Sequence, residues 1–381
     1  MSGSSPSLAQ VRVDLVGSFL RPPALKEAMT GFLQGTITAE ALQAVQDAAI
    51  RELLAEEERR GLPVVTDGEF RRLNFEHSFK DSVSGVEPWT ETYKRGFFAK
   101  REDTQGVHQG ADPAASTNRI LAPAERLRLK RNLPLEEYRF AAACTSAPVK
   151  VTLLGTDRLA QTFNPDAQQP VYGSLDAFLA DVVAIERRIA SELIDAGCPY
   201  IQIDAPSYTS YVDERNLAVM LAHGDNPAAN LERSIRADNA VLESLTGATF
   251  GIHLCRGNRQ SMWHRTGAYD AIAEQAFSTL RHDRFLLEYD TERAGGFEPL
   301  RFIPKGKIAV LGLITSKSGT LENSAAIKAR IDEAARWLPL EQLALSPQCG
   351  FASSVPGNLL SVDEQWRKID LMLEVARDVW G

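Results

Sequence analysis

The stretch TFGIHLC at residues 249–255 decides the fold that we expect for this chain. It is an apolar run of strand length, and its metal-capable side chains, His253 and Cys255, stand at its end. Because side chains alternate along a strand, these two residues would point to the same side. Zinc readily accepts imidazole and thiolate ligands, so the end of this strand is a candidate metal site.

Similar apolar runs recur on both sides of this stretch and alternate with helix-length amphipathic segments. This alternation favours parallel βα units over β-sandwiches and helical bundles. The predicted strands are 11–17, 63–66, 148–154, 200–204, 248–255, 285–289, 308–314 and 343–346. The predicted helices lie at about 38–60, 175–196, 230–246, 269–280, 324–337 and 362–379. The pattern predicts an α/β fold, a (β/α)8 TIM barrel, with a doubly wound open sheet as the alternative.

The alternation is interrupted between the second and third predicted strands. A segment of about 79–141 forms a long insertion with mixed charge and no clear periodicity, inside a single barrel domain that we expect to span residues 1–381. Its basic residues permit two interpretations, a solvated hairpin or helix on the surface, and an anion-attracting lid over the barrel mouth. These residues are Lys94, Arg95, Lys100, Arg101, Arg126, Arg128, Lys130 and Arg131.

Composition excludes several classes of function. The hydrophobic share of 44% is that of a globular protein, and the net charge of −8 argues against nucleic acid as a partner. No apolar run approaches the roughly 20 residues that a membrane helix needs, and no signal sequence is recognisable. We therefore expect a cytoplasmic protein with reduced cysteines and no membrane partner, and a homo-oligomer stays open. Cys144 and Cys198 are expected to serve ordinary packing.

Two further metal-capable residues follow predicted strands. Glu288 ends the run FLLE (285–288), and Cys349 follows the last strand in SPQCG (346–350). In a barrel the carboxyl ends of the strands converge on one rim. His253, Cys255, Glu288 and Cys349 would then supply the nitrogen, sulfur and oxygen atoms of a tetrahedral Zn²⁺ site. The carboxylate is the weakest of these ligands and could move aside to open a position for substrate.

A second polar group stands at the ends of earlier predicted strands. It consists of Ser18, Glu69 and Asp204. Two carboxylates and a hydroxyl on one rim could hold an ammonium group, and Glu69 and Asp204 could also act as catalytic acid and base. Each residue alone has a structural interpretation too, since an aspartate at a strand end often caps the next helix.

In this order along the chain, the motifs resemble the cobalamin-independent methionine synthase family, specifically its C-terminal catalytic barrel. The matching stretches are VGSF (16–19), DGE (67–69), QID (202–204), HLC (253–255), Glu288 and SPQCG (346–350). The ordered set is far more specific than any single motif, and it extends over nearly the whole chain.

The resemblance implies a zinc-dependent transferase that moves a methyl group to the zinc-bound thiolate of homocysteine and so serves methionine biosynthesis. The implied Zn²⁺ ligands are His253, Cys255, Glu288 and Cys349. The implied substrate-binding residues are Ser18, Glu69 and Asp204, to which we add Tyr208 and Thr315. The expected partners are a small-molecule thiol acceptor and a methyl or alkyl donor.

The sequence also departs from the family. Thr315 stands where the family carries a histidine acid, and a threonine cannot protonate a leaving group as an imidazole does. If a proton donor is needed, His77, Tyr208 and Tyr211 are the candidates. The chain is too short for the family's second barrel, so the methyl donor stays open. We favour methyl transfer to a homocysteine-type thiol. The alternatives are alkylation of another thiol, as in epoxyalkane:coenzyme M transferase, a metal-free decarboxylase of the related barrel superfamily, and a purely structural zinc site.

Overall fold

The computed structural model describes residues 8–86, 123–161, 163 and 171–381. Its main sheet contains six parallel strands in the order β3-β4-β5-β6-β7-β8, so each crossover places the next strand beside the last one. The strands are β3 (Lys150–Leu154), β4 (Tyr200–Asp204), β5 (Thr249–Leu254), β6 (Arg284–Glu288), β7 (Ile308–Ile314) and β8 (Leu343–Pro347). Nearly every residue in these strands is buried, as expected for a parallel sheet covered on both faces.

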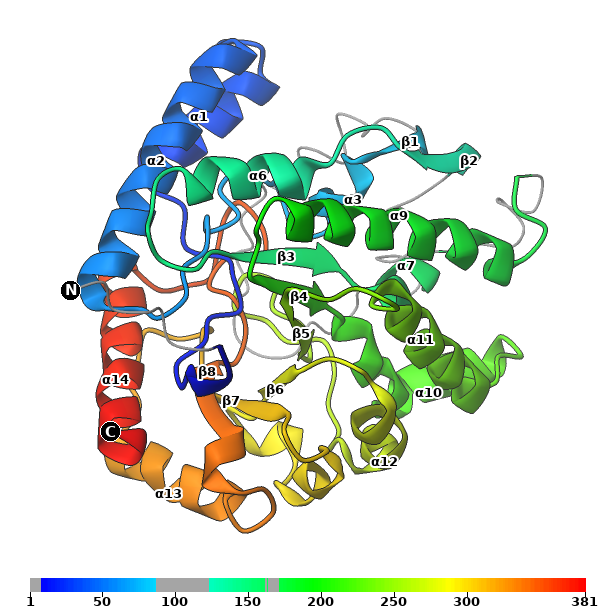
Figure 1. Cartoon of the computed structure of the whole chain (residues 1–381), viewed down its shortest axis with the longest axis vertical. Coiled ribbons are helices and arrows are strands. Elements are labelled where there is room, and N and C mark those ends of the chain that lie inside the picture. Colours follow the sequence, from blue (N-terminus) through cyan, green and yellow to red (C-terminus); the bar gives the residue numbers. More distant parts are fainter. Residues whose placement is uncertain (1–7, 87–122, 162, 164–170) are drawn as a thin grey trace.

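Helices surround this sheet (Figure 1). Those near the positions predicted from the sequence are α2 (Ala39–Arg60), α9 (Leu175–Asp195), α11 (Pro227–Val241), α12 (Asp270–Thr279), α13 (Ser324–Ala334) and α14 (Val362–Trp380). Several begin at a side-chain cap, and Ser361 forms a capping box with Glu364 at the start of α14. Further helices are α1 (Pro23–Leu33), α3 (His77–Lys80), α6 (Leu133–Ala142), α7 (Thr156–Ala160) and α10 (Glu214–Ala222).

The predicted strands 11–17 and 63–66 are wrong as strands. Each forms a single parallel bridge, Val13 with Leu345 of β8 and Val65 with Val149 beside β3. Side chains occupy two backbone carbonyls at the end of segment 11–17. Gln202 Nε2 donates to the carbonyl of residue 16 at 2.7 Å, and Thr66 Oγ1 donates to that of residue 17 at 2.7 Å. The two segments therefore lie along the outer edges of the six-stranded sheet without closing it by strand pairing.

Segment 11–17 carries a buried charge that several strands share. Asp14 accepts hydrogen bonds from Lys150 Nζ at 2.8 Å, Tyr200 Oη at 2.8 Å and Arg284 Nε at 3.0 Å. We call these four residues the Asp14 cluster. Three strands begin at the partners of Asp14: β3 at Lys150, β4 at Tyr200 and β6 at Arg284. The sheet therefore curves around residue 14. Val16 packs in a small apolar cluster with residues of β6, β7 and β8.

The insertion contains regular structure that its sequence pattern did not indicate. Strand β1 (Val83–Val86) pairs antiparallel with β2 (Pro123–Leu129), and helix α6 follows. Arg126 pairs with Asp181 of α9 at 2.8 Å, and Arg131 pairs with Glu136. The lid prediction for Lys94, Arg95, Lys100 and Arg101 lies outside the described residues.

Among the residues that the structure describes, no helix combines the length and the apolar composition that crossing a membrane requires.

Candidate metal centre

Three of the four predicted metal ligands meet at the carboxyl end of the sheet. His253 lies in β5, Cys255 directly follows that strand, and Cys349 follows β8. Their ligand atoms all lie within 4.8 Å of one another, and all three side chains are buried. Zinc bonds of about 2.0–2.3 Å place tetrahedral ligand atoms roughly 3.5 Å apart, so a small closure would complete the geometry. We call these residues the thiol–imidazole cluster.

The hydrogen bonding of His253 suits a metal ligand. Its Nδ1 lies 3.2 Å from the carbonyl oxygen of Leu286, and a carbonyl only accepts, so Nδ1 carries the hydrogen. The other ring nitrogen, Nε2, is buried and has no hydrogen-bond partner among the described residues. Leaving a buried polar atom unpaired costs free energy, which a bound metal would offset. The donor set and this unpaired nitrogen therefore fit a zinc ion.

The two cysteines of the cluster differ in acidity. A hydrogen bond from the Cys349 thiol and the charge of His253 hold the pKa of Cys255 well below its ordinary value, against the effect of burial. The same hydrogen bond, together with burial, raises the pKa of Cys349 well above its ordinary value. The pair therefore shares a proton around one stabilised thiolate. Metal binding would displace that proton, as at other thiolate sites.

Glu288, the fourth predicted ligand, ends β6 beside the cluster but is held by other partners. Its Oε1 accepts from Arg293, and its Oε2 accepts from the backbone N–H of Arg256 at 2.5 Å. Lys317 Nζ lies 4.0 Å from Oε1. Burial works to raise the pKa of Glu288, but Lys317, Arg293 and Arg256 outweigh it and lower that pKa. The carboxylate is therefore charged and engaged, and it stands outside the three-residue group.

Glu69 and Asp204 lie on the same side of the molecule as the cluster. Asp204 is the register partner of His253 on the neighbouring strand. Burial raises the pKa of Asp204 to about 7, and the Glu69 charge adds to that rise. Glu69 Oε1 accepts from Thr152 Oγ1 at 2.9 Å, whereas its Oε2 is buried without a hydrogen-bond partner among the described residues. Two nearby carboxylates with one such oxygen are chemically suited to a cation.

Ser18 packs against Gly350, the residue that follows Cys349. A Cβ atom on Gly350 would stand 2.0 Å from Ser18 Oγ, so only glycine permits this approach next to Cys349. Ser18 Oγ also accepts from the backbone N–H of Ala352 at 3.3 Å. The structure therefore places Ser18 against the loop that carries Cys349.

The remaining predicted substrate residues have other contacts. Tyr208 Oη donates to Asp238 of α11 at 2.8 Å, and Tyr211 Oη donates to Asp157 of α7 at 2.9 Å. Both hydroxyls are thus committed to buried carboxylates. Thr315 follows β7, and its Oγ1 accepts from the backbone N–H of residue 317 at 3.2 Å. His77 lies in α3, with Nδ1 3.2 Å from Asp81.

Several residues of the site were not recognised from the sequence. Gln202 donates from Nε2 to Asp204 Oδ1 at 2.7 Å, while its Oε1 accepts from Lys150 at 2.9 Å. Arg72 donates to Thr152 Oγ1 at 2.8 Å and lies 3.8 Å from Glu69. Gln202 stands two residues before Asp204 in a strand, and this spacing places both on one face. That signal was available, whereas the contacts of Arg72 depend on tertiary structure.

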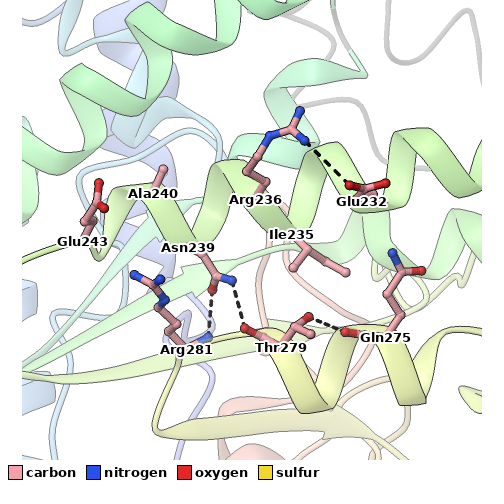
Figure 2. A pocket seen from close by; sticks show the side chains of 9 residues that line it. All are labelled: Glu232, Ile235, Arg236, Asn239, Ala240, Glu243, Gln275, Thr279 and Arg281. Carbon is pink, nitrogen blue, oxygen red and sulfur yellow. Dashed lines mark hydrogen bonds and ion pairs between the residues drawn. The ribbon is translucent and has the colours of Figure 1, made fainter.

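A surface groove of about 470 Å³ lies elsewhere, between α11 and α12 (Figure 2). Asn239 bridges its walls by donating to the Thr279 carbonyl at 2.9 Å and accepting from the Arg281 backbone N–H at 2.8 Å. Its lining contains neither a thiol nor an imidazole. The groove and the metal-capable residues are therefore separate features, and we base the functional argument on the latter.

Comparison with known proteins gives a consistent picture. Residues 13–378 match the family described as the catalytic domain of cobalamin-independent synthase. The protein YxjH of Bacillus subtilis is 36% identical, over 98% of this chain and 95% of its own length. A protein named methionine synthase from Pyrococcus abyssi is 25% identical, over 88% of this chain and 85% of its own length.

Solved structures agree in fold. A structure from Listeria monocytogenes, assigned as a vitamin-B12 independent methionine synthase, superposes with a TM-score of 0.73 and 27% identity over 100% of both chains. A B12-independent methionine synthase from Shewanella sp. W3-18-1, solved in complex with selenomethionine, gives a TM-score of 0.70 at 20% identity, over 97% of both chains.

Proposed function

Because the chain belongs to the cobalamin-independent methionine synthase family, we propose that it methylates a homocysteine-type thiol at a zinc site formed by His253, Cys255 and Cys349. Family membership makes the chain a methyl-transferring enzyme that acts on small molecules. The observation that carries the zinc assignment is the buried Nε2 of His253, which has no hydrogen-bond partner in the described part of the chain and lies beside two thiols.

The proposal includes the fold in its finer form. We treat the six-stranded sheet and segments 11–17 and 63–66 as an eight-unit (β/α)8 barrel in one domain. Two facts support this. The single bridges at Val13 and Val65 extend the sheet at both edges, and Asp14 contacts β3, β4 and β6 together. In such a barrel the carboxyl ends of the strands carry the active site, which is where the thiol–imidazole cluster lies.

The bound zinc would supply a lowered pKa for a coordinated thiol and so a thiolate nucleophile at neutral pH. The chain's own residues would place that substrate. Glu69 and Asp204 would bind an ammonium group, since the Glu69 charge helps to raise the pKa of Asp204 and a cation between the two would offset that effect. Ser18, held against the Cys349 loop, would bind the carboxylate end. Alignment of the sulfur with the methyl carbon would then provide most of the acceleration.

Zinc-edge X-ray absorption on the purified protein tests this function. We expect about one zinc per chain and, on adding homocysteine, the replacement of one nitrogen or oxygen neighbour by sulfur. Coenzyme M serves as the comparison thiol, because it lacks the ammonium group that Glu69 and Asp204 would bind. A protein without zinc, or with a zinc whose neighbours do not change with either thiol, would refute the proposal. A change with coenzyme M alone would shift the assignment to another thiol.

A further inference from the structure

We propose that Arg293 is a positioning residue that controls whether Glu288 can reach the metal. In this view Arg293 exchanges between two carboxylates, Glu288 and Asp290. Its contact with Glu288 keeps a metal position open for the substrate thiol, and its contact with Asp290 releases Glu288. The inference rests on the proposed zinc site and deepens it.

The first observation is that the Glu288 carboxylate has a complete set of partners without a metal. Arg293 occupies Oε1, and the Arg256 N–H occupies Oε2 at 2.5 Å. The Glu288 side chain is fully buried, and that of Arg293 is only 10% exposed. A carboxylate and guanidinium pair at such a place is strong, because little water competes for it. Glu288 can bind the metal with Oε1 only if the hydrogen bond from Arg293 is broken.

The second observation is an alternative acceptor next to Arg293. Asp290 Oδ1 lies 3.5 Å from Arg293 Nη2. Both carboxylate oxygens of Asp290 are buried without a hydrogen-bond partner among the described residues, and so is Nε of Arg293. Arg293 thus lies between two acids, at hydrogen-bond distance from Glu288 and 3.5 Å from Asp290. A shift of the guanidinium towards Asp290 would strengthen the second contact at the expense of the first.

The surroundings allow this shift with little movement elsewhere. The guanidinium of Arg293 stacks on the ring of Trp263 at 4.7 Å, which supports it in either position. Lys317 Nζ lies 4.0 Å from Glu288 Oε1 and makes no hydrogen bond within the described chain. Lys317 therefore keeps a positive charge near the two acids when Arg293 changes partner. The Arg256 N–H can hold Oε2 throughout.

Cobalt exchange provides a test, because Co²⁺ can replace zinc and its visible absorption reports the number and type of ligands. We would measure Co²⁺ release to a chelator, and the Co²⁺ spectrum with and without homocysteine. Arg293→Met should free Glu288 to bind, so release should slow by about tenfold or more. The spectral change with homocysteine should shrink. Arg293→Lys should lie closer to the wild type, because it keeps a charge.

Two further variants make the result specific. In the Glu288→Gln background, Arg293→Met should have no additional effect on release, because the proposed action passes through Glu288. Asp290→Asn removes the negative charge of the alternative acceptor, so Arg293 should stay on the charged Glu288 and release should become faster. It also covers the case in which Arg293→Met fails to fold.

The outcomes separate the two proposals. A wild-type protein that binds no Co²⁺ or Zn²⁺ overturns the proposed function and this inference with it. A wild-type protein that binds metal, with release unchanged or faster in Arg293→Met, overturns only the role of Arg293. Faster release would mean that Arg293 supports Glu288 as a ligand. An equal effect of Arg293→Met with and without Glu288 would also reject the exchange.

Discussion

Both ends of the central sheet contain buried charged residues, but the hydrogen bonding of these residues differs between the two ends. In the Asp14 cluster at the amino end, Asp14 accepts from three side chains, and Arg284 also donates to backbone carbonyls of residues 8 and 11 at 2.9 and 3.1 Å. At the carboxyl end, His253, Glu69 and Asp290 each retain a buried polar atom without a hydrogen bond among the described residues. The paired charges at the amino end stabilise the fold, whereas the polar atoms at the carboxyl end can contact a bound ligand.

The largest effect should come from a substitution at the carboxyl end that leaves stability nearly unchanged. Cys349→Ser removes a thiolate ligand, and we expect zinc loss together with a fall in methyl transfer of about a thousandfold or more. A bound metal stabilises the transition state by several kcal/mol, and each 1.4 kcal/mol or so changes the rate about tenfold. Metal content and turnover with homocysteine measure it, with Cys198→Ser as the matched control. A wild-type zinc content in Cys349→Ser would show that Cys349 does not bind the metal.

The opposite result is expected at the amino end. Asp14→Ala leaves Lys150 and Arg284 charged and unpaired in the interior, at a cost of about 3–5 kcal/mol in the free energy of unfolding. Urea unfolding measures this, and zinc content of the folded fraction should remain normal. A loss of less than about 1 kcal/mol would mean that the Asp14 cluster is not a structural element.

Replacing Asp204 should raise the free energy of unfolding, whereas replacing Asp14 should lower it. Burial raises its pKa from 3.8 to about 7, so between these values the folded state binds more protons than the unfolded state. Wild-type stability is therefore lost as the pH rises from about 4 to about 7, and it levels off above that. Asp204→Asn should stabilise the metal-free protein above pH 7 by about 2–4 kcal/mol, and by little near pH 4. A pH-independent difference in urea unfolding would contradict the assignment.

The smallest of these effects concerns substrate binding. Glu69→Gln removes one charge from the pair that would hold the substrate ammonium, and we expect KM for homocysteine to rise by about 10- to 100-fold. Zinc content should not change. As a control, Glu125→Gln alters an exposed acid of the insertion and should leave KM unaltered. An unchanged KM in Glu69→Gln would place the ammonium elsewhere.

The sequence predicted much of this architecture because parallel strands are continuous apolar runs. Strands β4 and β7 begin and end as predicted, and the run at 249–255 does contain β5. Segments 11–17 and 63–66 looked equally strand-like. Each forms a single bridge, at Val13 and at Val65, and periodicity does not report how many backbone groups pair.

The candidate site was predictable in its ligands but not in their partners. His253, Cys255 and Cys349 are recognisable by residue type and by their positions at strand ends. The engagement of Glu288 by Arg293 was not, because a short 3-10 turn (Glu292–Ala294) brings the arginine back to the end of β6. The commitment of Tyr208 to Asp238 likewise depends on the packing of α11, which no local pattern specifies.

The bridge between Val13 and β8 also bears on how the protein is made on the ribosome. The backbone N–H of residue 14 donates to the Leu345 carbonyl at 2.9 Å, and that of Leu345 donates to residue 12 at 2.8 Å. During translation, segment 11–17 emerges more than three hundred residues before this partner. Segment 11–17 therefore cannot form this bridge until residue 345 has been made. Cys349 emerges at the same late stage, so no nascent fragment that stops before it can assemble the thiol–imidazole cluster.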